Sequence, residues 1–173
     1  GETDLVTQNG PYSVTFNEDC RVVYTGLDNN YLKSISIKCP IAPGKYVFGG
    51  ASVEGDVTGI LASVDGLTIS GTCKTHSGGA QLGKDSLISF TAPAFTSVTI
   101  KGFDTNYGQL NVLVGGETIA MDAKACYVFT TSVAAKVEIS SVNVGTEEAP
   151  AYNKSYITYI DVLSIAVIGS AHT

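Results

Sequence analysis

Hydrophobic and polar residues alternate with a period of two in several stretches of the chain. Val14 and Phe16 stand between polar neighbours, and Ile88 and Phe90 repeat the pattern further on. Successive side chains of a β-strand point to opposite faces, so such a stretch buries one face and leaves the other in water. The pattern predicts strands throughout and no helix longer than about two turns. The buried positions we predict are Val14, Ile37, Phe90, Ile100, Val112, Val128 and Ile139.

Turn-forming residues separate these stretches. Asp65-Gly66 stands between Val64 and Leu67 and predicts a two-residue hairpin, because a type I′ turn needs positive φ at both central residues. Further turn signals are Asn9-Gly10-Pro11, Pro43-Gly44, Ser77-Gly78-Gly79 and Gly115-Gly116. About ten to twelve strands result, and two packed sheets accommodate that number best. We therefore predict an all-β fold, a two-sheet antiparallel β-sandwich or jelly roll, with residues 1–173 as a single domain.

The composition indicates a protein that works outside the cytoplasm. Only 15% of the residues are charged, against ~25% in ordinary domains, and 19 are glycines. A net charge of −6 and a single arginine, Arg21, do not provide the basic field that nucleic acid requires. No apolar run reaches the ~20 residues of a membrane helix, and a start at Gly1 without an initiator Met is typical of a processed product or an excised module. We expect a secreted, extracellular or cell-surface protein without a membrane span.

The cysteines stand at positions 20, 39, 73 and 126. None of them forms the close pairs that structural zinc sites use, which argues against metal chelation. In an oxidising compartment they predict largely oxidised thiols, with three possible pairings of two disulfides. Buried free thiols are the alternative, because cysteine is among the residues most often buried.

The chain offers little material for catalysis, and we predict that it is not an enzyme. His76 lies in a Ser/Gly-rich stretch that predicts a loop, and His172 stands next to the C-terminal residue. A nucleophile needs a base that a third group holds rigidly, and neither histidine suits that role. Glycoside hydrolysis needs two carboxylates that are paired only in space, so loop acids such as Asp104 leave that option open.

Tyrosines in polar loops are the strongest functional signal. Tyr107 ends the stretch Asp104-Thr105-Asn106-Tyr107, with Gln109 two residues later, and Tyr31 ends a similar stretch, Asp28-Asn29-Asn30-Tyr31. Tyr152 and Tyr156 flank Asn153-Lys154-Ser155. An aromatic ring stacks on the apolar face of a sugar while amides exchange hydrogen bonds with its hydroxyl groups. Turns in which a neighbouring tyrosine packs across the loop base are the alternative. The glycan-contacting residues that we predict are Tyr107, Asn106, Gln109, Tyr31, Tyr152 and Tyr156.

Asp161 interrupts the apolar segment near the C-terminus. Ile160 and Val162 share one face of the expected strand, whereas Leu163 and Ile165 share the other, and a bulge near Val162 would explain the change. An acid at a bulge can bind calcium together with backbone carbonyls, and on that reading calcium is a structural cofactor. The alternative is a charge on an edge strand that discourages aggregation.

Two segments resemble a known class of extracellular modules. Phe90-Thr91-Ala92-Pro93, followed by Ser97-Val98-Thr99-Ile100-Lys101-Gly102, resembles a strand pair of β-sandwich carbohydrate-binding modules. The segment from Ser155 to Ile165 is similar to the closing strand of galactose-binding-like modules. The resemblance covers roughly residues 85–168. It implies a lectin-like domain that binds a neutral glycan or polysaccharide, with a structural calcium ion at Asp161.

A different class of function is also open. The chain could be a structural subunit of an extracellular filament, coat or matrix that assembles by strand addition. The strand-like stretch Asp4 to Gln8 and the apolar C-terminal strand are the segments that could pair with a neighbouring subunit. Carbohydrate binding and assembly are therefore the two functions to weigh against the structure.

Overall fold

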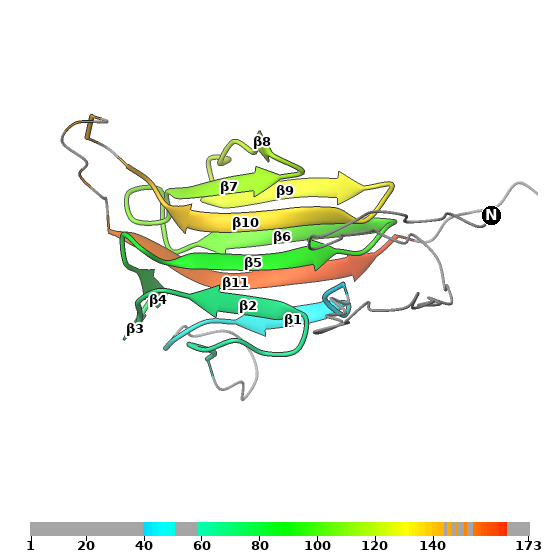
Figure 1. The fold of residues 1–173 in the computed structure, drawn as a ribbon, viewed down its shortest axis with the longest axis horizontal. Coiled ribbons are helices and arrows are strands. Elements are labelled where there is room, and N and C mark those ends of the chain that lie inside the picture. The colour runs from blue at the N-terminus through cyan, green and yellow to red at the C-terminus, as the bar shows by residue number, and fades with distance from the viewer. Residues whose placement is uncertain are drawn as a thin grey trace, which may run out of the picture. The chain divides into compact units, whose positions relative to one another are not determined.

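The computed structural model describes residues 40–50, 59–143, 145–146, 148, 151 and 154–165. All of them belong to the unit Ser36–Thr173 of the two units into which the chain divides. A single domain over residues 1–173 stays a prediction, since residues 1–39 are not described. The described residues contain eleven β-strands and no helix (Figure 1). The all-β fold is therefore confirmed, and this part of the chain has no helix that is long and apolar enough to cross a membrane.

The strands form two antiparallel sheets that pack against each other. The six-stranded sheet has the order β3 (Cys73–His76), β4 (Gly79–Leu82), β11 (Ser155–Ser164), β6 (Thr96–Gly102) and β9 (Cys126–Thr131), and β1 (Gly44–Val47) pairs with β11. The five-stranded sheet has the order β2 (Leu67–Ser70), β5 (Leu87–Ala92), β10 (Ala135–Ser141), β7 (Leu110–Val114) and β8 (Glu117–Thr118). This arrangement is the predicted two-sheet β-sandwich.

The strands from β4 to β11 pair as in one long hairpin, in which each pair of strands encloses the next pair along the chain. β7 pairs with β8, β6 with β9, β5 with β10 and β4 with β11. Successive pairs lie alternately in the five-stranded and the six-stranded sheet, so the long hairpin is rolled into a sandwich. This is the strand order of a jelly roll, in which two Greek keys share one core. The jelly-roll prediction is therefore confirmed for the described residues.

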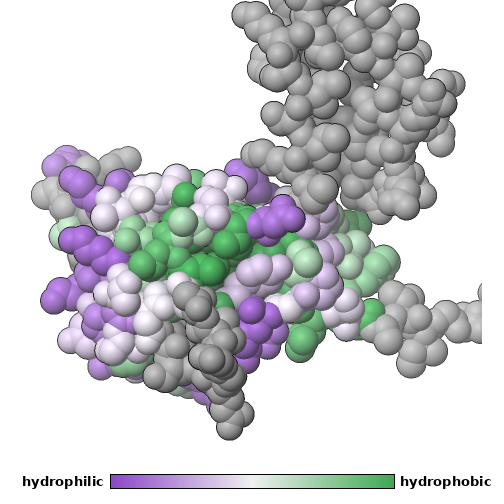
Figure 2. All heavy atoms as spheres, turned by 90° about the horizontal axis from the view of Figure 1, so that it is seen from below, coloured by the Kyte–Doolittle hydropathy of each residue, from purple (hydrophilic) through white to green (hydrophobic). Residues whose placement is uncertain are grey.

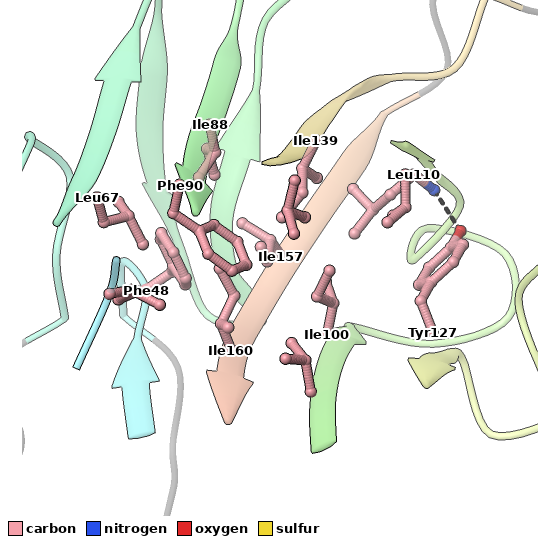
Figure 3. Close-up of a cluster of buried hydrophobic side chains, with 14 of the residues drawn as sticks. Phe48, Leu67, Ile88, Phe90, Ile100, Leu110, Tyr127, Ile139, Ile157 and Ile160 are labelled. Atoms are coloured by element: carbon pink, nitrogen blue, oxygen red, sulfur yellow. Dashed lines mark hydrogen bonds between the residues drawn. The ribbon is translucent and has the colours of Figure 1, made fainter. Parts of the chain in front are cut away.

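The core lies between the sheets and takes alternate residues from each strand. β5 and β10 contribute the fully buried Ile88 and Ile139, and β6 contributes Ile100 from the opposite sheet. Figure 3 shows these side chains pointing toward one another from the two layers. Of the predicted core residues, Phe90, Ile100, Val112 and Ile139 are buried, whereas Val14 and Ile37 lie outside the described residues.

Val128 was wrongly predicted to be buried, because its side chain is 54% exposed. In β9 the inward positions are taken by the buried Tyr127 and by Phe129, which packs against the core. Three apolar residues in a row leave the phase of the alternation undetermined. The larger aromatic neighbours fill the core, so Val128 faces water.

The bulge in β11 lies at Thr158 and not near Val162. The pairing with β6 is shifted between Ile157 and Tyr159 and then continues without interruption to Ser164. An extra residue in one strand reverses the alternation at that point. This explains how Ile157 and Ile160 are both fully buried although they are three residues apart. The exposure of Leu163 and Ile165 needs no second bulge, because ordinary alternation beyond Val162 turns Leu163 to the outside.

Two of the predicted turns form, although only the second has the geometry of a type I′ turn. Val64 and Leu67 exchange backbone hydrogen bonds of 2.9 and 3.0 Å across Asp65-Gly66, but only Gly66 of these two turn residues has a positive φ, so this turn is not of type I′. Gly115 and Gly116 join β7 to β8, both with positive φ as a type I′ turn requires.

Figure 2 shows the side of the molecule on which β1 and β2 lie in Figure 1. Apolar residues gather in the middle of this view, with hydrophilic residues around them. Just before β2, Leu61 and Val64 are among the exposed large hydrophobic residues. Among the described strands β1 pairs only with β11 and β2 only with β5. Apolar residues are thus exposed on the side of the molecule where these two strands lie.

Candidate functional site

Four aromatic side chains meet around the first residues of β11. The aromatic cluster, as we call it, consists of His76, Phe103, Tyr107 and Tyr156. The imidazole of His76 stacks on the Tyr156 ring with a centroid distance of 4.0 Å, and Tyr107 meets the same ring edge to face at 5.9 Å. Phe103 meets Tyr156 edge to face at 6.4 Å. Three separate segments, β3, the loop 103–109 and β11, thus supply one group of rings.

The rings differ in how much surface they show to solvent. Tyr156 stands at the centre and is only 6% exposed, because the other rings cover it. Phe103 is 42% exposed and Tyr107 46% exposed. Monomeric soluble proteins usually pack aromatic rings away from water, so two half-exposed rings on a packed base mark a surface suited to a ligand.

The loop 103–109 that carries Phe103 and Tyr107 is held by its own backbone and by Asp104. One carboxylate oxygen of Asp104 accepts hydrogen bonds from the amides of Asn106 and Tyr107, at 2.9 and 2.7 Å. The Asp104 carbonyl accepts a further bond from Gly108. This Asx-type arrangement fixes the turn and leaves the Asn106 and Tyr107 side chains on the outside. It gives the Asp104 carboxylate a structural role in this loop.

The same loop is tied to β11 and to β9. The Tyr156 amide donates to the Tyr107 carbonyl at 2.8 Å, and the Phe103 amide donates to the Tyr156 carbonyl at 3.1 Å. From β9 the buried hydroxyl of Tyr127 accepts the Leu110 amide at 2.6 Å and donates to the Gly108 carbonyl at 3.4 Å (Figure 3). Burial raises the pKa of Tyr127, although the bond from Leu110 partly opposes this rise. The phenol therefore stays protonated and can make both bonds at once.

We expect Tyr127→Phe to reduce the free energy of unfolding by about 1–3 kcal/mol, because the buried Leu110 amide would lose its partner. The ring stays in place in this variant, so packing is retained. Equilibrium unfolding in urea measures the loss. The control is Tyr107→Phe, whose hydroxyl belongs to a half-exposed side chain and whose loss we expect to stay below about 0.5 kcal/mol. Equal losses in both variants would show that the Tyr127 hydroxyl does not anchor the loop.

The structure brings four of the six predicted glycan-contacting residues to one end of β11. Tyr107 and Tyr156 are in ring contact, Asn106 is exposed, and the half-buried Gln109 donates from its amide to the Thr105 carbonyl at 3.4 Å. Tyr156 supports Tyr107 from below and presents little surface of its own. Tyr31 and Tyr152 lie outside the described residues.

Sequence reasoning missed two members of the aromatic cluster. His76 was expected in a loop, but it ends β3, and its Nδ1 accepts the Gly78 amide at 3.0 Å, which orients the ring. Phe103 follows the last residue of β6 and directly precedes Asp104, a position that marks it as the first residue of the same loop. The position of Phe103 next to Asp104 could have placed it in this loop from the sequence alone. The contact of His76 with Tyr156 depends on strand pairing.

Asp161 lies in a central strand and not at an edge. It pairs with Lys45 of β1 on one side and with Thr99 of β6 on the other, so the explanation as an edge-strand charge is wrong. Its carboxylate is 3.9 Å from the Lys45 ammonium group, which also lies 4.5 Å from the centre of the Tyr159 ring. Within the described ranges no group of three or more His, Cys, Asp or Glu side chains could hold a metal ion. Calcium at Asp161 stays a prediction.

The two cysteines in the described part of the chain, Cys73 and Cys126, are both free. Burial raises the pKa of the Cys73 thiol, and a hydrogen bond to Ser86 only partly opposes this rise. A raised pKa keeps the thiol protonated and makes it a poor nucleophile. The structure thus contains no disulfide among the described residues, and Cys20 and Cys39 lie outside them. Oxidation of the thiols stays a prediction.

Comparison with known proteins identifies no relative: no family model, no curated protein and no solved structure matches the chain.

Proposed function

We propose that this chain is a non-catalytic, lectin-like domain of an extracellular protein that binds a neutral glycan on the aromatic cluster. The observation that carries the proposal is the pair of half-exposed rings, Phe103 and Tyr107, on a base of packed aromatic side chains. The apolar face of a pyranose stacks on such rings, while neighbouring polar groups bind its hydroxyls.

The polar neighbours of Tyr107 suit this role. Asn106 is exposed, and within the described part of the chain its side-chain amide makes no hydrogen bond, so both its nitrogen and its oxygen are available. The half-buried Gln109 lies two residues after Tyr107 and uses one amide hydrogen within the loop. An amide offers donors and acceptors without charge, which matches the hydroxyl groups of a neutral sugar.

Rigidity of the loop supports the proposal as well. The Asp104 carboxylate and the Tyr127 hydroxyl fix the backbone of residues 104–110, so little conformational freedom would be lost on binding. Preorganisation of this kind raises affinity because less ordering is left for the binding step. The surface is nevertheless open and shallow, so we expect dissociation constants in the roughly micromolar to millimolar range.

We expect Tyr107→Ala to weaken glycan binding by about tenfold or more, which corresponds to the ~1.4 kcal/mol expected for a lost stacking surface. A glycan array first selects the ligand, and isothermal titration calorimetry then measures its dissociation constant. The matched control is Phe95→Ala, which removes an aromatic ring that is 50% exposed in the loop between β5 and β6.

Three outcomes separate the possibilities. Loss in Tyr107→Ala alone supports the proposal. Undiminished binding in Tyr107→Ala would place the glycan elsewhere, and Tyr31 and Tyr152 would then be tested in the same way. No binding across a broad array would contradict the carbohydrate-binding function itself.

A subunit of an extracellular assembly is the second candidate, and exposed apolar residues favour it. Leu163 is 58% exposed, and the Ile165 amide donates to the carbonyl of the half-exposed Phe95, which brings these residues together. Strand addition through Ser155–Ser164 would require β11 to leave its sheet, since the strand is paired on both sides. Residues 4–8 lie outside the described ranges. Concentration-dependent polymers in negative-stain microscopy would support this candidate.

A further inference from the structure

A polar cleft opens where β7 begins and β10 ends. Its volume is about 610 Å³, within the range of ligand sites, and it is distinct from the aromatic cluster. Leu110 and Ser141 are its most buried lining residues, each less than a tenth exposed. The lining residues used below are Lys84, Leu110, Asn111, Ser140, Ser141 and Asn143.

Hydrogen bonds fix the walls of the polar cleft. The Ser141 hydroxyl lies 3.1 and 3.0 Å from the carbonyl oxygens of Leu82 and Gly83, which holds the loop between β4 and β5 against β10. The Asn111 amide nitrogen donates to the Ser140 hydroxyl at 3.3 Å across the paired strands. The cleft is thus built from strand ends whose positions are set by the fold.

Several polar groups of the cleft have unused hydrogen-bonding capacity. The side-chain oxygen of Asn111 and the side-chain nitrogen of Asn143 make no hydrogen bond within the described part of the chain. The side-chain oxygen of Asn143 accepts the amides of Gly145 and Ala151. An acceptor on Asn111 of β7 and a donor on Asn143, two residues after β10, suit a ligand with several hydroxyl groups.

Lys84 is the one charged residue among the described residues that line the cleft, in a chain whose net charge is −6. Its side chain is exposed and forms neither an ion pair nor a hydrogen bond with any described residue. Lys84 also lines a neighbouring cleft of about 240 Å³, whose charged residues include both Lys74 and Asp85. An unpaired ammonium group beside neutral amides favours a ligand that combines hydroxyl groups with a negative charge.

We propose that the polar cleft binds an anionic sugar residue of the same glycan whose neutral residue stacks on Tyr107. This inference rests on the proposed function, but it narrows the ligand to a glycan that is neutral only in the residue stacked on Tyr107 and acidic in the residue that binds near Lys84. The two sites are close along the chain, because Leu110 follows Tyr107 by three residues and their Cα atoms are at most about 11 Å apart. The anion is either a carboxylate or a sulfate, since both present negatively charged oxygens that can pair with the Lys84 ammonium group.

The test is calorimetry with four saccharides: a uronic acid oligosaccharide, its carboxyl-reduced form, a sulfated neutral oligosaccharide and its unsulfated form. We expect the wild type to bind one anionic saccharide about tenfold more tightly than its neutral form, with the preference weakening at high salt. Lys84→Ala should remove the preference and leave binding of the neutral form unchanged. A preference within the uronic acid pair identifies the anion as a carboxylate, and a preference within the sulfated pair identifies it as a sulfate.

Lys124→Ala is the control, since it removes the same charge from an exposed side chain outside the polar cleft. Equal binding of charged and neutral forms by the wild type, a preference that survives in Lys84→Ala, or an equal loss in Lys124→Ala would each overturn the inference. In those cases the neutral saccharides would still bind through Tyr107, and the proposed function would stand. Absence of binding to all four saccharides would overturn the inference, and absence of binding across the glycan array as well would overturn the proposed function.

Discussion

Gly79→Ala is expected to cost more than about 3 kcal/mol of unfolding free energy or to prevent folding. Gly79 has a φ of +125°, and a Cβ on this residue would overlap the carbonyl of Ile157 in the neighbouring strand. That carbonyl belongs to the backbone of the central strand β11 and cannot move aside without breaking the pairing with β6. The substitution therefore adds a steric clash to an unfavourable backbone conformation.

The control for this variant is Gly116→Ala in the turn between β7 and β8. Gly116 also has a positive φ, +91°, but a Cβ there would meet no atom within 4 Å. Only the backbone conformation is then penalised, at roughly 1–2 kcal/mol. Guanidinium unfolding of the two variants measures the difference, which isolates the contact between Gly79 and β11. Similar losses in both variants would show that the close approach at Gly79 is not required.

Val98→Ala should lower the free energy of unfolding by about 2–3 kcal/mol. Val98 is fully buried on β6, and its side chain lies in the core between the sheets. Removing two methyl groups takes away about 0.8 kcal/mol of burial for each and leaves a cavity that adds to the loss. Urea unfolding measures the effect, with one m-value, the dependence of the unfolding free energy on urea concentration, used for all variants.

The control is the same substitution in the neighbouring strand β9. Val128→Ala removes the same atoms from a side chain that is 54% exposed, so we expect a change below about 0.5 kcal/mol. The pair of variants also checks the direction in which β9 faces the core. A larger loss for Val128 than for Val98 would mean that the strand is turned the other way.

The strands were predictable wherever apolar and polar residues alternate without ambiguity. Phe90 on β5 and Ile139 on β10 follow the alternation and are buried as predicted, and Ile88 lies on the same buried face of β5 as Phe90. At Val128 the alternation has no defined phase, because Tyr127 and Phe129 are apolar as well. The bulge at Thr158 was placed four residues too late because its effect, two buried isoleucines three residues apart, depends on contacts across the sheet.

The candidate site was only partly predictable for a similar reason. The loop with Asn106 and Tyr107 carries its own signal, since Asp and Asn stabilise turns through side-chain hydrogen bonds. The contact of His76 with Tyr156 arises because β3 and β11 both flank β4. The polar cleft likewise combines residues from β7, β10 and the loop after β4, which are far apart in sequence. Pairing of distant strands is needed to see either site.

The most direct test of the central proposal is an NMR titration of the ¹⁵N-labelled chain with the glycan selected on the array. The proposal predicts that the largest amide shift changes fall on residues 103–109 and on the Asn106 side-chain amide. It also predicts that these changes disappear in Tyr107→Ala. Shift changes confined to other loops, or none at saturating glycan, would contradict binding on the aromatic cluster.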